Sequence, residues 1–173
     1  MKQIASIQNI LLLLFFVAFI SGCKKDDPQP LQAEVKAKLL AGDAGSSKSW
    51  KMVTFTEKTG TGAEMPIALS CAADNIYKFS NNALQAYEVS EGSNKCDPTD
   101  PAISETGTWA FTLDGTVLLL TNKTPNFDAY FQLATFFPYP GEIIELSESI
   151  LKIKMTHTED GTTIIDTFTF NKN

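Results

Sequence analysis

Short segments with strand chemistry fill most of this 173-residue chain, and they constrain its fold more than any other feature. Each segment is rich in Val, Ile, Thr, Phe and Tyr, and turn-forming residues separate it from the next. Asp114-Gly115 and Asp160-Gly161 each join two such segments, and Asp-Gly is a strong hairpin signal. The sequence therefore predicts a largely antiparallel sheet. We expect its strands near residues 49–56, 75–80, 84–90, 107–113, 116–121, 128–136, 142–147, 150–157 and 162–170.

One segment before these strands has helical periodicity. Within residues 31–41, apolar side chains recur at helical spacing among Ala, Glu and Lys, at Leu31, Val35, Leu39 and Leu40. Gly42 suits the end of a helix. Eight or nine antiparallel strands with one short helix predict an all-β fold. Periodicity alone leaves open whether this fold is a sandwich or an up-and-down barrel.

The first two dozen residues differ from everything that follows. An uninterrupted apolar run from Ile10 to Ile20 is too short to span a bilayer but has the length of a signal-peptide core. It ends in Ile20-Ser21-Gly22-Cys23, which resembles the lipobox of bacterial lipoproteins. The resemblance implies that residues 1–22 are a signal peptide and that Cys23 becomes a lipid-carrying N-terminus. The alternative is a cysteine that follows an apolar helix by chance.

Residues 23–30 combine the cysteine with a dense run of charges and prolines, which cannot pack into a core. We expect a flexible tether that reaches at most about 3.3–3.6 Å per residue. Within it, Lys25-Asp26-Asp27 resembles the surface-export signal of Bacteroidetes lipoproteins, the alternative being a solvated linker. The resemblance implies lipid anchoring at the outer membrane, on the cell surface.

The cysteine count fits that compartment. Of three cysteines, lipidation consumes Cys23 and leaves Cys71 and Cys96 as an even pair in an oxidising space. We predict a disulfide between them, closing a loop of about 26 residues and stabilising the fold by about 3 kcal/mol. Two buried free thiols are the alternative. A zinc site is not expected, because the only histidine, His157, is distant in sequence.

Several segments of the remaining chain occur in a recognisable order. A Trp-containing strand at 49–53 is followed by Cys71 before an aromatic strand, then by Cys96, a Gly107-Thr108-Trp109 strand, and late strands at 143–146 and 151–155. Together these residues resemble the lipocalin-like domain of Bacteroidetes lipoproteins. The resemblance implies an antiparallel up-and-down barrel of about eight strands with a short helix near one end. Residues 31–46 would then form the helix and a linker, and 47–173 the barrel domain.

Lipocalin-like barrels commonly enclose a small apolar molecule, so their inward-facing side chains are candidates for ligand contacts. Strand alternation places the candidate ligand-lining residues at Trp50, Phe79, Tyr87, Trp109, Phe111, Met155 and Phe168, with Leu119, Ile153 and Phe170 also pointing inward. The alternative is that these side chains simply fill the barrel. The aromatic segment from Phe127 to Tyr139 is expected to pack on the barrel or to form a contact patch or lid.

The charge and the motifs of the chain exclude several classes of function. A formal net charge of −6 without a basic patch excludes nucleic acid as a partner. We expect no enzyme, cofactor or metal, since His157 lies in a polar strand end and Asp97 and Asp100 suit turn capping. Two functions remain. The chain is predicted to be a surface-anchored lipoprotein that binds a small hydrophobic molecule or glycan fragment, or else a non-catalytic module with a solid barrel that contacts another envelope protein.

Overall fold

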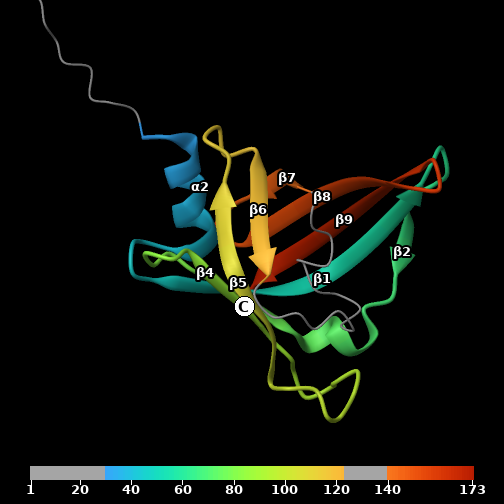
Figure 1. The fold of residues 1–173 in the computed structure, drawn as a ribbon, viewed down its shortest axis with the longest axis horizontal. Helices are drawn as coiled ribbons and strands as arrows, with labels where there is room; N and C mark the ends of the chain where they lie inside the picture. Colours follow the sequence, from blue (N-terminus) through green and yellow to red (C-terminus); the bar gives the residue numbers. More distant parts are fainter. Residues whose placement is uncertain (1–29, 123–139) are drawn as a thin grey trace, which may run out of the picture.

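The computed structural model describes residues 30–122 and 140–173, and Figure 1 shows their arrangement. The predicted signal peptide, most of the tether, the predicted strand 128–136 and the aromatic segment from Phe127 to Tyr139 lie outside the described residues. In chain order the elements are α2 (Gln32–Ala41), β1 (Ser47–Thr59), β2 (Met65–Ile67), the 3-10 helix η1 (Ser70–Asp74), β3 (Ile76–Ser80), β4 (Ala86–Ser90), β5 (Ile103–Phe111), β6 (Val117–Asn122), β7 (Gly141–Leu146), β8 (Ile150–Glu159) and β9 (Thr162–Lys172).

The sheet closes on itself. β1 pairs with β3, and the strands from β3 to β9 each pair antiparallel with the next along the chain. β1 also pairs antiparallel with β9, from Trp50 opposite Lys172 to Thr59 opposite Ile164. Because this pairing removes two sheet edges, eight of the described strands form an up-and-down barrel. The predicted all-β, lipocalin-like barrel with one short helix is therefore confirmed.

Two hairpin turns follow the predicted chemistry. Asp160 and Gly161 have φ values of 47° and 77°, so both turn residues adopt the left-handed conformation that a two-residue type I′ turn between β8 and β9 requires. In the β5–β6 turn, Gly115 has a φ of 69° and the Asp114 carboxylate accepts a hydrogen bond from the Thr116 N–H at 3.1 Å. Both Asp-Gly hairpins are therefore confirmed.

Helix α2 covers one end of the barrel, where it packs against β1, β3, β5 and β7 (Figure 1). Its buried residues are Ala37, Leu40 and Ala41, whereas Leu31 and Val35 are 53% and 38% exposed. The predicted helix is therefore confirmed, and two of the apolar residues that indicated it lie outside its buried face. Small alanine side chains let the helix backbone lie close to the barrel, and this close approach rotates the packed face away from the larger residues.

Strand alternation defines the interior. In β9, for example, Asp166, Phe168 and Phe170 are buried while the residues between them are half-buried. One expected inward residue is wrong, because Leu119 is 39% exposed and its neighbours Leu118 and Leu120 are buried instead. The three consecutive leucines carry no alternation that could reveal which of them points inward.

The observed strands differ from the predicted ones mainly at β5 and β2. β5 begins at Ile103 rather than near residue 107, so Glu105 belongs to a barrel strand. β2 was not predicted, and it pairs with Phe55–Glu57 of β1 on the side where β3 pairs with Ser47–Lys51. The long β1 strand therefore has two different neighbours along one of its edges.

Candidate functional site

The barrel interior brings the predicted ligand-lining residues together in one hydrophobic core. Trp50, Phe79, Tyr87, Trp109, Met155 and Phe168 are buried there, and the half-buried Phe111 packs against them. Neighbouring rings are in direct contact. Phe55 and Phe168 stack with centroids 4.6 Å apart, and Trp109 meets Phe79 edge-on at 6.4 Å. The predicted aromatic side chains thus share the interior, and Phe55 and Tyr77 join them without having been predicted.

The half of the interior next to α2 is apolar. The indole N–H groups of its two tryptophans both donate hydrogen bonds to backbone carbonyls. The Trp50 indole N–H donates to the Leu40 carbonyl at 2.8 Å, and the Trp109 indole N–H donates to the Ser80 carbonyl at 3.2 Å. Lys48 reaches the same helix end, where its Nζ donates to the Leu39 carbonyl at 3.0 Å. The bonds of Trp50 and Lys48 fix α2 to the barrel, whereas that of Trp109 joins β5 to the end of β3.

A buried polar group interrupts this apolar interior. Glu105 on β5 is 0% exposed, and the hydroxyl of Tyr87 on β4 donates a hydrogen bond to its carboxylate. Gly107 lies directly opposite Tyr87 in the β4–β5 pairing, and a Cβ at Gly107 would collide with the Tyr87 ring. The glycine therefore lets the Tyr87 ring lie across β5 with its hydroxyl on Glu105.

Electrostatics keep the nearby tyrosines protonated. Burial, the hydrogen bond to Glu105 and its charge raise the pKa of Tyr87 above its usual range. The pKa of Tyr77, fully buried on neighbouring β3, is raised by burial and then by Glu105. Both hydroxyls therefore keep their protons at any ordinary pH, and that of Tyr87 is donated to Glu105. The buried carboxylate thus lies beside two protonated tyrosines inside a mainly apolar interior.

Sequence reasoning missed Glu105 because the predicted strand began two residues later, which placed the carboxylate in a loop. A signal for it does exist. Glu105, Gly107, Trp109 and Phe111 alternate along one face of β5, and extending that period toward the N-terminus would have pointed Glu105 inward. A lone acid at the start of a strand is normally solvent-exposed, so the pattern is easy to discount.

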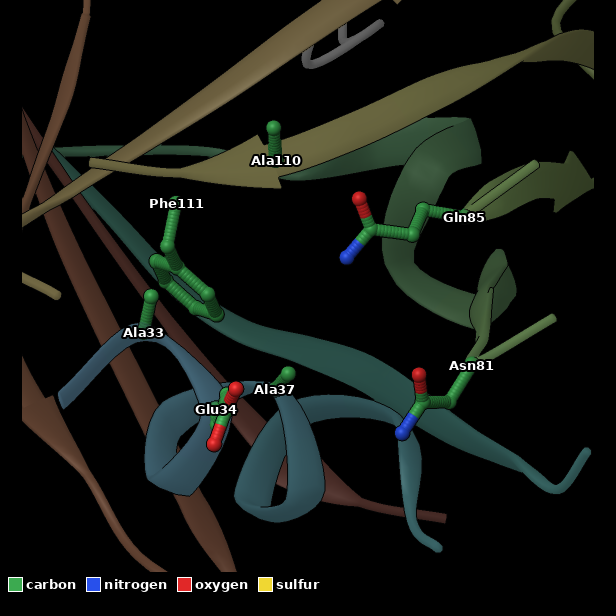
Figure 2. Close-up of a pocket in the computed structure, with 7 residues that line it drawn as sticks. All are labelled: Ala33, Glu34, Ala37, Asn81, Gln85, Ala110 and Phe111. Atoms are coloured by element: carbon green, nitrogen blue, oxygen red, sulfur yellow. The ribbon is translucent and has the colours of Figure 1, made fainter. Parts of the chain in front are cut away.

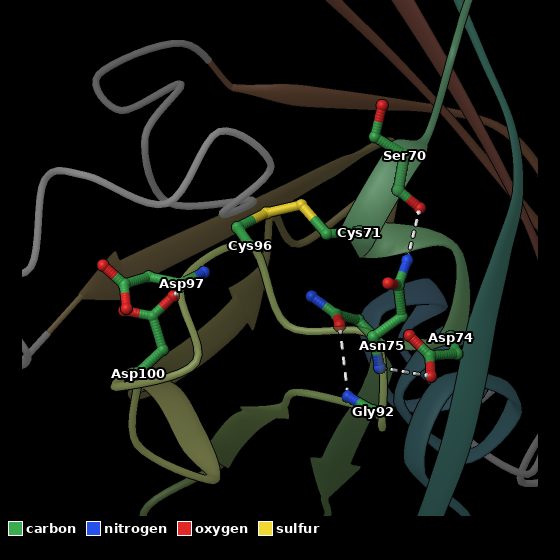
Figure 3. Close-up of a disulfide and its surroundings, with 9 residues drawn as sticks. Ser70, Cys71, Asp74, Asn75, Gly92, Cys96, Asp97 and Asp100 are labelled. Atoms are coloured by element: carbon green, nitrogen blue, oxygen red, sulfur yellow. Dashed lines mark hydrogen bonds between the residues drawn. A yellow bond between two sulfur atoms is a disulfide. The ribbon is translucent and has the colours of Figure 1, made fainter.

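The disulfide joins Cys71 in η1 to Cys96 in the loop before β5, with the Cα atoms 5.1 Å apart (Figure 3). Asp74 holds the same loop, since its carboxylate accepts the N–H groups of Ser93 at 2.8 Å and Asn94 at 3.2 Å. These bonds, that of Asn94 foremost, lower the pKa of Asp74. The predicted cysteine pair is confirmed, and it anchors the loop to the barrel wall.

The carboxylates in this loop cap turns, as predicted. Asp97 Oδ1 accepts the Thr99 N–H at 2.8 Å, and Asp100 Oδ2 accepts the Asp97 N–H at 3.0 Å. The hydrogen bonds from Thr99 lower the pKa of Asp97. Among residues 30–122 and 140–173, no group of three or more His, Cys, Asp or Glu side chains is arranged to hold a metal ion.

An open cleft of about 310 Å³ lies between α2 and the barrel wall (Figure 2). Ala33, Glu34 and Ala37 of the helix form one side, and the other side is lined by Asn81, Gln85, Ala110 and Phe111. Phe111, expected deep in the barrel, thus forms part of a surface cleft as well as of the core. Sequence reasoning missed this cleft because it depends on how the helix docks against distant strands.

Comparison with known proteins adds no identity. In the part of the chain that the structure describes, no helix is long and apolar enough to cross a membrane. No protein-family model matches the sequence, and no curated protein matches it either. The lipocalin-like barrel is therefore established by its strand pairing, while membership of the Bacteroidetes lipoprotein family stays a prediction.

Proposed function

We propose that this protein is a surface-anchored lipoprotein whose barrel binds a small, mainly hydrophobic molecule through one hydrogen-bonding group. The observation that carries the proposal is the fully buried Glu105, hydrogen-bonded to Tyr87 inside a mainly apolar interior. Small-molecule sites typically combine apolar walls with a few placed polar groups, and this interior has that composition. The proposal is for a binding protein rather than an enzyme.

Burying Glu105 costs folding free energy. Removing a carboxylate from water is expensive, and an apolar side chain of similar volume in its place is often neutral or stabilising. A buried acid in a small barrel is therefore better explained by ligand recognition than by stability. Its hydrogen bond to Tyr87 orients the carboxylate, and its charge acts on the buried Tyr77, whose pKa it helps to raise.

The test is native mass spectrometry of the mature protein released from membranes in mild detergent. We expect the wild type to carry a non-covalent small molecule and Glu105→Leu to lose it, because the variant keeps the apolar wall and removes the polar contact. Glu88→Gln is the matched control. Glu88 lies on β4, where it forms an ion pair with Lys78 at 3.0 Å. A wild-type protein that is always bare would contradict ligand binding.

The second candidate, a solid module that contacts another envelope protein, is favoured by a different observation. Trp50, Phe79 and Phe168 are completely buried, as are Leu151 and Ile153, so much of the interior is filled by its own side chains. Small barrels are often packed in this way. For such a module, Glu105→Leu would be more stable than the wild type and equally bare in the mass spectrum.

A further inference from the structure

At the barrel end away from α2, the inward-facing positions change from apolar to ionisable. Phe55 of β1, Met155 of β8 and Phe168 of β9 are buried in the core. On each of these strands, the residue two positions closer to this barrel end is ionisable: Glu57 on β1, His157 on β8 and Asp166 on β9. Figure 1 shows this end at the β8–β9 turn, opposite the helix.

These ionisable side chains form one cluster. Glu57 lies directly opposite Asp166 in the β1–β9 pairing. The Nδ1 atom of His157 is 3.6 Å from Asp166 Oδ2, and its Nε2 atom is 3.7 Å from Glu159 Oε1. The cluster therefore holds three carboxylates around a single imidazole, which gives it an excess of negative charge.

Asp166 is the member that points to a ligand. Its side chain is 2% exposed, and its Oδ1 atom is buried without a hydrogen-bond partner in the described structure. Buried carboxylate oxygens normally accept hydrogen bonds, and residues 30–122 and 140–173 supply no donor to this one. The burial of Asp166 and the missing hydrogen-bond donor at its Oδ1 atom are observations separate from the number of acids in the cluster.

The missing donor should carry positive charge, since Glu57 and Glu159 add negative charge around Asp166. The described residues contain no group arranged to hold a metal ion, so a metal cation does not suit the cluster. A protonated primary amine supplies both the charge and up to three N–H donors. Charge-assisted hydrogen bonds of this kind are among the stronger ones in proteins.

We propose that the cluster around Asp166 binds the protonated primary amine of a small organic molecule at the barrel end away from α2. This site is separate from Tyr87 and Glu105, and it does not depend on the function proposed above. Asp166 supplies the principal acceptor, Glu57 and Glu159 supply the negative field, and the imidazole of His157 helps to hold Asp166 in place.

The test uses n-butylammonium chloride as the probe, with the full mature chain in mild detergent, followed by isothermal calorimetry and backbone NMR. We expect chemical-shift changes at residues 155–159 and 164–168. Asp166→Asn should weaken binding by about tenfold or more, because it removes one charge-assisted acceptor while keeping the shape. Glu145→Gln, at an exposed position of β7, should bind as the wild type does.

A second probe separates hydrogen bonding from charge alone. Tetramethylammonium has the same charge and no N–H, so it should bind about tenfold more weakly than butylammonium. Equal binding of the two cations, or no effect of Asp166→Asn, would overturn the proposal. Calcium that displaces butylammonium would assign the site to a metal instead, and a lysine peptide that binds more tightly would assign it to a protein ligand. An absence of shifts would leave only water as the donor and reject the site.

Discussion

Asp166 shows how burial changes the chemistry of a single residue. Its position in the barrel raises its pKa to about 6, chiefly because burial disfavours the charged form. Glu57 and Glu159 add to the rise, and His157 opposes it. The folded state therefore holds the Asp166 proton more tightly than the unfolded state does. Its charge costs little stability near pH 4 and costs most above pH 6, once the folded protein has lost the proton.

This dependence predicts the pH profile of a variant. Asp166→Asn should raise the free energy of unfolding by about 1–2 kcal/mol at pH 8, after allowance for solvent screening, and by much less at pH 4. Urea unfolding at pH 4, 5, 6 and 8 would measure the difference, with Glu145→Gln as the control. A gain that is the same at pH 4 and pH 8 would show that removal of the charge is not its cause.

At this scale the sequence predicted aromatic residues better than acidic ones. Trp50, Phe79 and Phe168 were expected inside the barrel because apolar residues on alternating positions have few other places to go. Glu105 and Asp166 were missed because carboxylates are rarely buried, although each alternates with inward-facing aromatic residues of its own strand. The polar part of both candidate sites is thus carried by the sequence alternation, which the usual exposure of acids led us to discount.

Helix α2 illustrates the same limit for an element. Its existence followed from local periodicity, but its buried face did not, because the barrel decides which side of the helix is covered. Leu40 is fully buried and its carbonyl accepts the Trp50 indole N–H at 2.8 Å, while Val35 faces solvent. The docking of α2 therefore depends on Leu40 and the neighbouring alanines rather than on the larger residues of the first turn.

A pair of matched substitutions tests this orientation. Leu40→Ala should lower the free energy of unfolding by about 2–5 kcal/mol, because it leaves a cavity between α2 and the barrel end. Val35→Ala, on the same helix, should change it by less than about 0.5 kcal/mol. Denaturant unfolding followed by circular dichroism measures both values. Similar losses for the two variants would mean that α2 docks through a different face.

For the whole molecule, the proposed location depends on Cys23, which precedes the described residues. Cys23→Ala should move the protein from the membrane fraction to the soluble fraction, because it removes the acyl chains that hold it there. Metabolic labelling with palmitate should mark the wild type and not the variant. Cys71→Ala is a useful control, since it breaks the disulfide and should leave labelling and fractionation unchanged. Labelling that persists in Cys23→Ala would contradict the anchor.

The pairing of β1 with β9 also governs when the molecule can form. It joins the first of the described strands to the last, so a chain emerging from the ribosome cannot complete its barrel until Thr162–Lys172 has been synthesised. Until then β1 and β8 each lack a neighbour, and contacts of such long sequence separation form slowly. The surface lipoprotein proposed here has to cross a membrane, and a barrel that cannot close before its last strand is made suits a chain that crosses unfolded.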